Sequence, residues 1–353
     1  MDQNSGKTAW NITGNGKNIW VVSFIFTLDA VDVRIAHALP TIQVVFFPVL
    51  AIIALPVNMV TIFILSRGKC GLSRVVTCYL VAMAAADLLV LILDLILSKL
   101  PLTYMSYSVF LRSMPSSCNV HAALMYTATD CSVWFTVTFT FDRFVAICCQ
   151  KLKTKYCTGK TAAVVLGTAS VISCLKNIYW YFRLLREYTW IISPFICFAR
   201  DYYFYIMKQI ELFYNFITPV FPFVLVLVTN GFTVRHVLVT SRPRRKLRIP
   251  GNGQRSRDPE MEKRRKSLVL LLIVSGNFIL LWAPFTVYSM WSRLYDLSTS
   301  VYPPDSLREL GSILQLLSCC TNMALYAVTQ TKFREQLKNV VKSPLALFVS
   351  KKS

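Results

Sequence analysis

The sequence predicts an all-α integral membrane protein: a bundle of seven transmembrane helices with an extracellular N-terminus and a short amphipathic eighth helix. Of its 353 residues, 55% are apolar and only 16% are charged, whereas soluble domains carry about 25% charged residues. Seven apolar stretches reach the roughly 20 residues that a helix needs to cross the hydrocarbon core. Helices satisfy their own backbone hydrogen bonds in lipid, and these stretches lack the alternation of barrel strands. The expected spans are residues 42–66, 75–98, 118–147, 160–180, 209–238, 267–291 and 307–330.

The orientation follows from the positive charges of the short loops, which accumulate on the cytoplasmic side. The first loop carries Arg67, Lys69 and Arg74, and the loop 242–266 has Arg or Lys at eleven positions. The opposite loops are poor in positive charge. We therefore expect an extracellular arm over 1–41, a receptor domain over 42–330, and an amphipathic helix with a cytoplasmic tail over 331–353. Asn11 begins an Asn-Ile-Thr glycosylation signal on the extracellular arm.

Other classes of protein fit the composition less well. The net charge of +21 is arranged in short blocks between apolar spans, which indicates membrane topology and contact with lipid headgroups rather than nucleic-acid binding. A channel or transporter would show a charged pore or broken helices near the midplane. No set of His, Cys and carboxylate residues suggests an enzyme, and no cysteine cluster has zinc spacing. We therefore expect a multi-pass membrane protein that is not an enzyme.

Two of the eleven cysteines fall on the oxidising side of the membrane. Cys118 begins the third span, and Cys197 lies in the long loop that follows the fourth. Exposed thiols in an exported loop are open to oxidation, so we expect a disulfide between them. Two unpaired thiols are the alternative.

Charged residues inside the spans are costly and mark candidate functional sites. Asp87 follows three alanines in the second span. With oxygen ligands from Ser132, Ser318 and Asn322, it could hold a sodium ion, the one cofactor-like group that we expect. The alternative is a protonated Asp87 bonded to Asn58 and Asn322. No role was evident for Asp94 or Asp130.

Asp142, Arg143 and Phe144 end the third span on the cytoplasmic side. Taken alone, Arg143 could simply extend to the lipid headgroups.

The ordered motifs of the spans resemble the rhodopsin-like (class A) family of G-protein-coupled receptors. They occur in the family's order and on the expected sides of the membrane: Asn58, Asp87, Cys118, Asp142-Arg143-Phe144, Pro222, Leu281-Trp282-Ala283-Pro284 and Asn322 to Tyr326. The resemblance implies a plasma-membrane receptor that couples an extracellular ligand to a heterotrimeric G protein. It also implies that Trp282 and Pro284 form the pivot of span six, that Arg143 meets the G protein, and that Tyr326 moves toward Arg143 on activation.

Several residues depart from the family pattern. Phe144 replaces a tyrosine, Met323 a proline and Asn230 a tyrosine, while Arg264 stands where an acidic partner of Arg143 is usual. A like charge cannot restrain Arg143, which predicts raised signalling without ligand. A receptor-like protein that never signals, or one that is constitutively active, is the alternative function.

The chain also resembles a small group of orphan receptors for which aromatic amino acids have been proposed as ligands. The shared features are the Leu-Trp-Ala-Pro motif, the ending from Asn322 to Tyr326 without a proline, Asn230, and Tyr179-Trp180 at the end of span four. Those relatives carry an acid in span three and an arginine after the proline of span six, where this chain has Met125 and Phe285. The missing acid argues against amine ligands. We expect an aromatic, neutral pocket for a peptide, an amino-acid-like compound or an apolar small molecule. Its expected lining is His121, Met125, Tyr126, Thr129, Asn215, Phe285, Tyr288, Ser289, Ser312 and Gln315.

Overall fold

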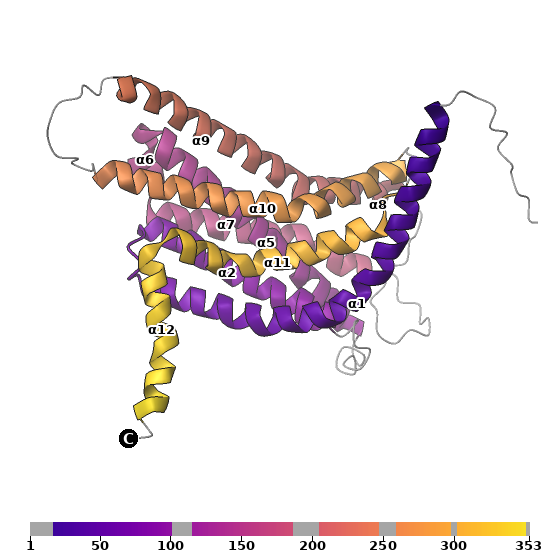
Figure 1. Ribbon diagram of the computed structural model, residues 1–353, viewed down its shortest axis with the longest axis horizontal. Coiled ribbons are helices and arrows are strands. Elements are labelled where there is room, and N and C mark those ends of the chain that lie inside the picture. Colours follow the sequence, from indigo (N-terminus) through magenta and orange to yellow (C-terminus); the bar gives the residue numbers. More distant parts are fainter. Residues whose placement is uncertain (1–16, 101–114, 186–204, 247–258, 298–301, 351–353) are drawn as a thin grey trace, which may run out of the picture.

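The computed structural model describes residues 17–100, 115–185, 205–246, 259–297 and 302–350, and the regular elements of this part of the chain are all helices, without strands (Figure 1). Seven helical regions are long and apolar enough to cross a membrane. The expected fold class is therefore confirmed. The spans cover Ala38–Ser66, Arg74–Lys99, Asn119–Cys148, Gly159–Phe182, Gln209–Val239, Ser267–Tyr295 and Asp305–Thr329. No expected end differs from these by more than four residues, because the length and hydropathy of each stretch suffice to locate it.

The helices that form these spans continue beyond the apolar stretches. The first five are α1 (Lys17–Ser66), α2 (Arg74–Val90), η1 (Leu91–Lys99), α5 (Pro115–Cys148) and α7 (Gly159–Leu185). The last five are α8 (Tyr205–Asn215), η2 (Phe216–Val220), α9 (Phe221–Lys246), α10 (Pro259–Leu297) and α11 (Asp305–Thr329). α9 and α10 extend into the basic loop from both sides. α1 begins at Lys17 and passes the expected boundary at residue 41 without a break.

Two cytoplasmic helices lie outside the spans. α6 (Gln150–Tyr156) occupies the basic loop between spans three and four and was not expected from the sequence. α12 (Thr331–Ser350) follows α11 and occupies most of the segment 331–353, in which an amphipathic helix and a tail were expected. Figure 1 shows α12 in yellow, leaving the bundle across its long axis, as expected of a helix on the membrane surface. Phe333 on α12 is fully buried against the ring of Tyr326.

The second and fifth spans each contain a wide, π-helical turn. In η1 the N–H of Leu100 reaches the carbonyl of Leu95, and in η2 the N–H of Phe221 reaches that of Phe216, both five residues apart. Thr218 in η2 departs from helical backbone angles. Such turns are rare and are frequent at functional sites. Both border the same cavity, described below.

Apolar side chains form the interior and also cover the outside of the bundle. Large residues such as Ile52, Leu280 and Val328 are each 74% exposed on the helix surfaces, which suits contact with lipid. Inside, α10 and α11 approach closely at Gly311. A methyl group added there would lie 2.8 Å from the Cα and N atoms of Phe285. The missing side chain of Gly311 therefore allows this close approach of the two helices.

Candidate functional site

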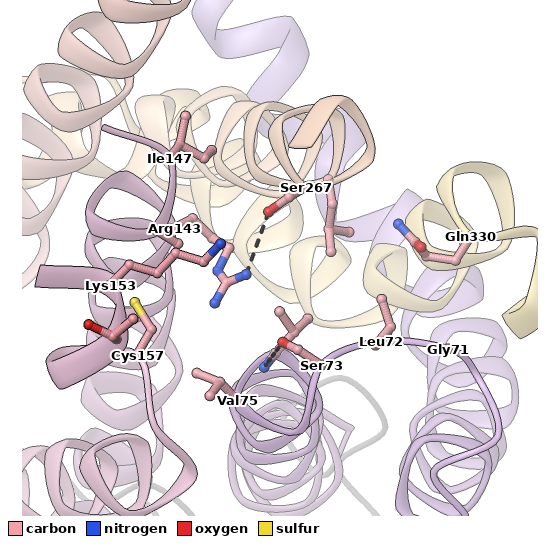
Figure 2. Close-up of a pocket in the computed structure, with 14 residues that line it drawn as sticks. Gly71, Leu72, Ser73, Val75, Arg143, Ile147, Lys153, Cys157, Ser267 and Gln330 are labelled. Atoms are coloured by element: carbon pink, nitrogen blue, oxygen red, sulfur yellow. Dashed lines mark hydrogen bonds between the residues drawn. The ribbon is translucent and has the colours of Figure 1, made fainter. Parts of the chain in front are cut away.

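A cavity of about 500 Å³ opens at the cytoplasmic end of the bundle, and Figure 2 shows its lining. Arg143, at the end of α5, points into it and is only 6% exposed. The side chain therefore does not extend along the lipid-facing surface. Its Nε donates to Oδ2 of Asp142 at 3.0 Å, and its Nη2 forms an ion pair with the same oxygen. Asp142 is almost fully buried, so the guanidinium is held by its own helix.

The contact from Arg143 to span six is weak. Its Nη1 lies 3.5 Å from the hydroxyl of Ser267 on α10, a distance at the limit for a hydrogen bond (Figure 2). The side chain of Arg264, one turn earlier, lies outside the described residues. The contact that the structure shows between Arg143 and α10 is therefore a single weak hydrogen bond to an uncharged hydroxyl rather than an ion pair.

The other expected switch residues surround this region. Tyr326 on α11 is fully buried, and its hydroxyl has no hydrogen-bond partner. Phe144 is half-buried beside Phe141. Asn230 on α9 buries its side-chain oxygen without a partner. Unsatisfied buried polar atoms are uncommon, and those of Tyr326 and Asn230 could gain partners in a second conformation.

Cys157 is a lining residue of the cytoplasmic cavity that the sequence did not point to. Its Sγ lies 3.7 Å from the backbone carbonyl of Asp142, to which it donates. Burial, followed by the negative charge of Asp142, raises the pKa of the Cys157 thiol to about 11. The thiol is therefore protonated, and hence a poor nucleophile, at neutral pH.

Trp282 lies in the middle of α10, where it connects spans six and seven. It is 3% exposed and packs against Phe278 and Phe285. Its Nε1 donates to the hydroxyl of Ser318 at 3.1 Å, and that hydroxyl donates to the carbonyl of Gln315 at 2.7 Å. Pro284 lies two residues further along α10, where it cannot donate a backbone hydrogen bond.

Asp87 forms a buried polar cluster between spans two, three and seven. Its Oδ1 accepts from the Ser132 hydroxyl and its Oδ2 from the Asn322 amide, each at 2.6 Å. Three of the four expected sodium ligands therefore meet, while Ser318 is directed to Trp282 instead. Asn58 does not bond to Asp87, because its amide donates to the carbonyls of Ala54 and Cys319. A carboxylate beside a serine hydroxyl and an amide fits a hard cation.

A second cavity, of about 260 Å³, opens toward the outer end of the bundle. Seven of the ten expected pocket residues line it: Met125, Tyr126, Thr129, Asn215, Phe285, Ser312 and Gln315. The other three do not. His121 directs Nε2 to the carbonyl of Leu93 at 2.8 Å, the Tyr288 hydroxyl lies 3.4 Å from that of Tyr302, and Ser289 is buried.

The expectation of a neutral pocket was wrong, because four charged residues also line this cavity: Asp94, Lys99, Asp130 and Lys176. Asp130 on α5 forms an ion pair with Nζ of Lys176 on α7 at 2.7 Å. The Asn177 amide donates to the same carboxylate at 2.5 Å, and Lys176 also donates to Thr218 at 3.2 Å. The pair thus connects spans three, four and five. A lysine inside span four was a signal that the sequence interpretation had overlooked.

The extracellular sites predicted from the sequence lie outside the described residues. This applies to Asn11, to Cys197 and to the side chain of Cys118, so the glycosylation site and the disulfide remain predictions. The nine cysteines whose side chains the structure describes are free thiols.

A seven-span helical bundle with a cavity at each end is the architecture of a membrane receptor. The family model of the 7 transmembrane receptor (rhodopsin family) matches residues 57–326, more than half of the chain, and the chain therefore belongs to this family. Its members are signalling receptors rather than enzymes.

Curated relatives are distant and cover most of the chain. The rat type-2 angiotensin II receptor is 24% identical over 326 residues, which span 90% of this chain and 83% of the relative. The human type-2 angiotensin II receptor is 23% identical over 352 residues, or 97% and 88% of the two chains. The mouse probable G-protein coupled receptor 142 is 24% identical over 308 residues, or 85% and 73%.

Proposed function

We propose that this chain is a plasma-membrane receptor that converts the binding of an extracellular ligand in the outer cavity into activation of a heterotrimeric G protein at the cytoplasmic cavity. The observation that carries the proposal is that two helices line both cavities. α5 contributes Thr129 to the outer cavity and Arg143 to the inner one, and α10 contributes Phe285 and Ser267. A displacement of either helix at the outer end therefore changes the shape of the inner cavity.

The interior between the two cavities contains several polar side chains among its apolar residues, and the contacts of these polar groups can exist in more than one arrangement. Gln315 lines the outer cavity, and its carbonyl accepts from Ser318, which in turn accepts from Trp282. One turn further along α11, Asn322 binds Asp87. Side chains that bridge helices through single hydrogen bonds can exchange partners when the helices move.

The ligand belongs to a class that a small outer cavity can hold. The resemblance to the orphan group with proposed aromatic amino-acid ligands favours an amino-acid-like compound over a peptide or an apolar small molecule. The aromatic side chains of Tyr126, Trp180, Tyr214 and Phe285 around the cavity support this preference.

We also propose that Asp87, Ser132 and Asn322 hold a sodium ion that favours the resting state. The ion would replace the direct hydrogen bonds to the carboxylate with charge neutralisation by an oxygen-bound cation. Asp87 is 3% exposed, and a buried carboxylate is stabilised by a neighbouring cation.

The G-protein proposal is tested by measuring G-protein dissociation in cells that express the wild type or Arg143→Ala at equal surface density. We expect the variant to lose the signal, both basal and ligand-induced. Equal signals from the two would instead support a receptor-like protein that does not signal through this site.

The same assay tests the resting state. Arg264→Glu would place an acid on the helix that meets Arg143, and we expect it to lower the signal measured without ligand. An unchanged basal signal would contradict the proposal that Arg264 leaves the resting state weakly restrained.

A further inference from the structure

Asp94 is a carboxylate that lines the outer cavity without a protein partner. It lies in η1, one of the two π-helical turns that border the cavity. Within the described part of the chain, it forms neither a hydrogen bond nor an ion pair. An acid at membrane depth is expensive to keep charged unless a cation or hydrogen-bond donors compensate it. Asp94, which is half-buried, therefore lacks the direct hydrogen bond or ion pair that the buried acids Asp87 and Asp130 have.

Asp130, the other acid that lines the cavity, has direct partners for its carboxylate. Asp130 has Nζ of Lys176 at 2.7 Å and the amide of Asn177 at 2.5 Å on the same oxygen. Its charge is neutralised inside the protein, so it has little attraction left for a ligand. Of the two acids that face the cavity, Asp94 is the one able to act as a counter-ion.

The charged and titratable groups that interact electrostatically with Asp94 are Lys99 and His121. Lys99 lies five residues further along η1, about one turn of this wide helix, and also lines the cavity. His121 directs Nε2 to the carbonyl of Leu93 rather than to Asp94. In the described chain, neither residue forms an ion pair with the Asp94 carboxylate.

The rest of the cavity limits the size and shape of a cationic ligand. Its volume of about 260 Å³ falls below the roughly 300–1,000 Å³ of pockets for drug-sized ligands. Tyr126 and Trp180 form a stacked pair, with centroids 4.4 Å apart and planes 20° apart, and they line the cavity together with Phe285. Aromatic faces attract both other rings and ammonium groups.

From this arrangement we infer that the outer cavity binds a small aromatic amine, whose ammonium group pairs with the Asp94 carboxylate. The inference rests on the proposed function only in using the same cavity as the ligand site. It reverses the expectation drawn from Met125: the acid missing from span three is supplied by span two. A neutral or acidic analogue of the same shape would leave Asp94 uncompensated.

Direct binding to the purified full-length receptor in lipid nanodiscs tests this inference. The probes are tryptamine, its neutral analogue 3-ethylindole and its acidic analogue indole-3-propionate. We expect saturable binding of tryptamine and little binding of the other two. Asp94→Asn should weaken tryptamine binding about ten- to hundredfold, the effect of losing a hydrogen bond to a charged group. Asp305→Asn, which removes an equal charge at an exposed site at the outer start of α11, is the matched control and should change nothing.

Two further variants distinguish a loss of binding from a loss of folding. If Asp94→Asn lowers the melting temperature without ligand, Asp94→Glu and Asp94→Gln replace it, and binding should survive only in the first. Equal binding of the neutral analogue, binding insensitive to Asp94, or no tryptamine binding at millimolar concentration would each overturn the inference. G protein is absent from this assay, so tryptamine binding without G-protein activation in cells would refute the proposed function alone.

Discussion

The close approach of α10 and α11 at Gly311 permits a quantitative prediction. In Gly311→Ala, the new methyl carbon would lie 2.8 Å from the backbone N and Cα of Phe285, whereas carbon atoms prefer about 3.5–4.0 Å. Backbone atoms cannot rotate away, so the two helices must separate by nearly 1 Å. Overpacking of this kind costs about 1–3 kcal/mol. At about 2–4 °C per kcal/mol, the melting temperature should fall by about 2–12 °C.

The assay is thermal denaturation of the detergent-solubilised receptor, followed by the loss of its monodisperse chromatographic peak. Gly167→Ala is the matched control, because no atom lies within 4 Å of the added methyl group and the residue is inside α7. Alanine in place of glycine inside a helix is stabilising by about 0.5–1 kcal/mol. The control should therefore melt at or slightly above the wild-type temperature. Equal melting of Gly311→Ala and the wild type would show that α10 and α11 do not depend on this contact.

Three further predictions concern polar groups of the bundle. Lys176→Met should destabilise the receptor by about 3–5 kcal/mol, because it leaves the Asp130 carboxylate buried and unpaired. In the same thermal assay, Lys176→Met combined with Asp130→Asn should recover part of this loss. No recovery would mean that the two residues are not coupled. Cys157 should react slowly with maleimide at pH 7, because its pKa of about 11 makes its thiolate fraction about a hundredfold smaller than a pKa of 9.0 would give. Peptide mapping should show that its labelling rate rises about tenfold per pH unit up to pH 9. Rapid labelling that does not depend on pH would refute the raised pKa. The wild type should melt at a higher temperature in sodium chloride than in choline chloride, and Asp87→Asn should melt at the same temperature in both salts. An equal effect of sodium on the wild type and the variant would argue against the sodium site.

The sequence was sufficient for the spans and for much of the switch region. Each span is a long apolar stretch, and its limits follow from hydropathy alone. Asp87 and Asn322, which are 235 residues apart, could be expected to meet because the family motif contains both, and the structure joins them at 2.6 Å. Arg143 was likewise assigned to the cytoplasmic end by its motif.

The charges of the outer cavity could not be predicted in the same way. Whether Asp94 faces the cavity depends on the rotation of span two about its axis, and its π-helical turn shifts that rotation in a manner that hydropathy does not report. The pairing of Asp130 with Lys176 requires two separate helices to meet at one height. The close contact at Gly311 depends on backbone positions rather than on side-chain character.

The weak contact between Arg143 and the uncharged Ser267 has a consequence for how the receptor would respond to its surroundings. A hydrogen bond from a charged donor contributes about 1.5–3 kcal/mol at good geometry and less at 3.5 Å, and because Ser267 carries no charge, this contact depends little on ionic strength. The position of the inner half of α10 is then determined mainly by apolar packing around Leu270 and Val274, both 2% exposed. Temperature and the thickness of the surrounding bilayer should therefore influence the balance between resting and active forms more strongly than salt does.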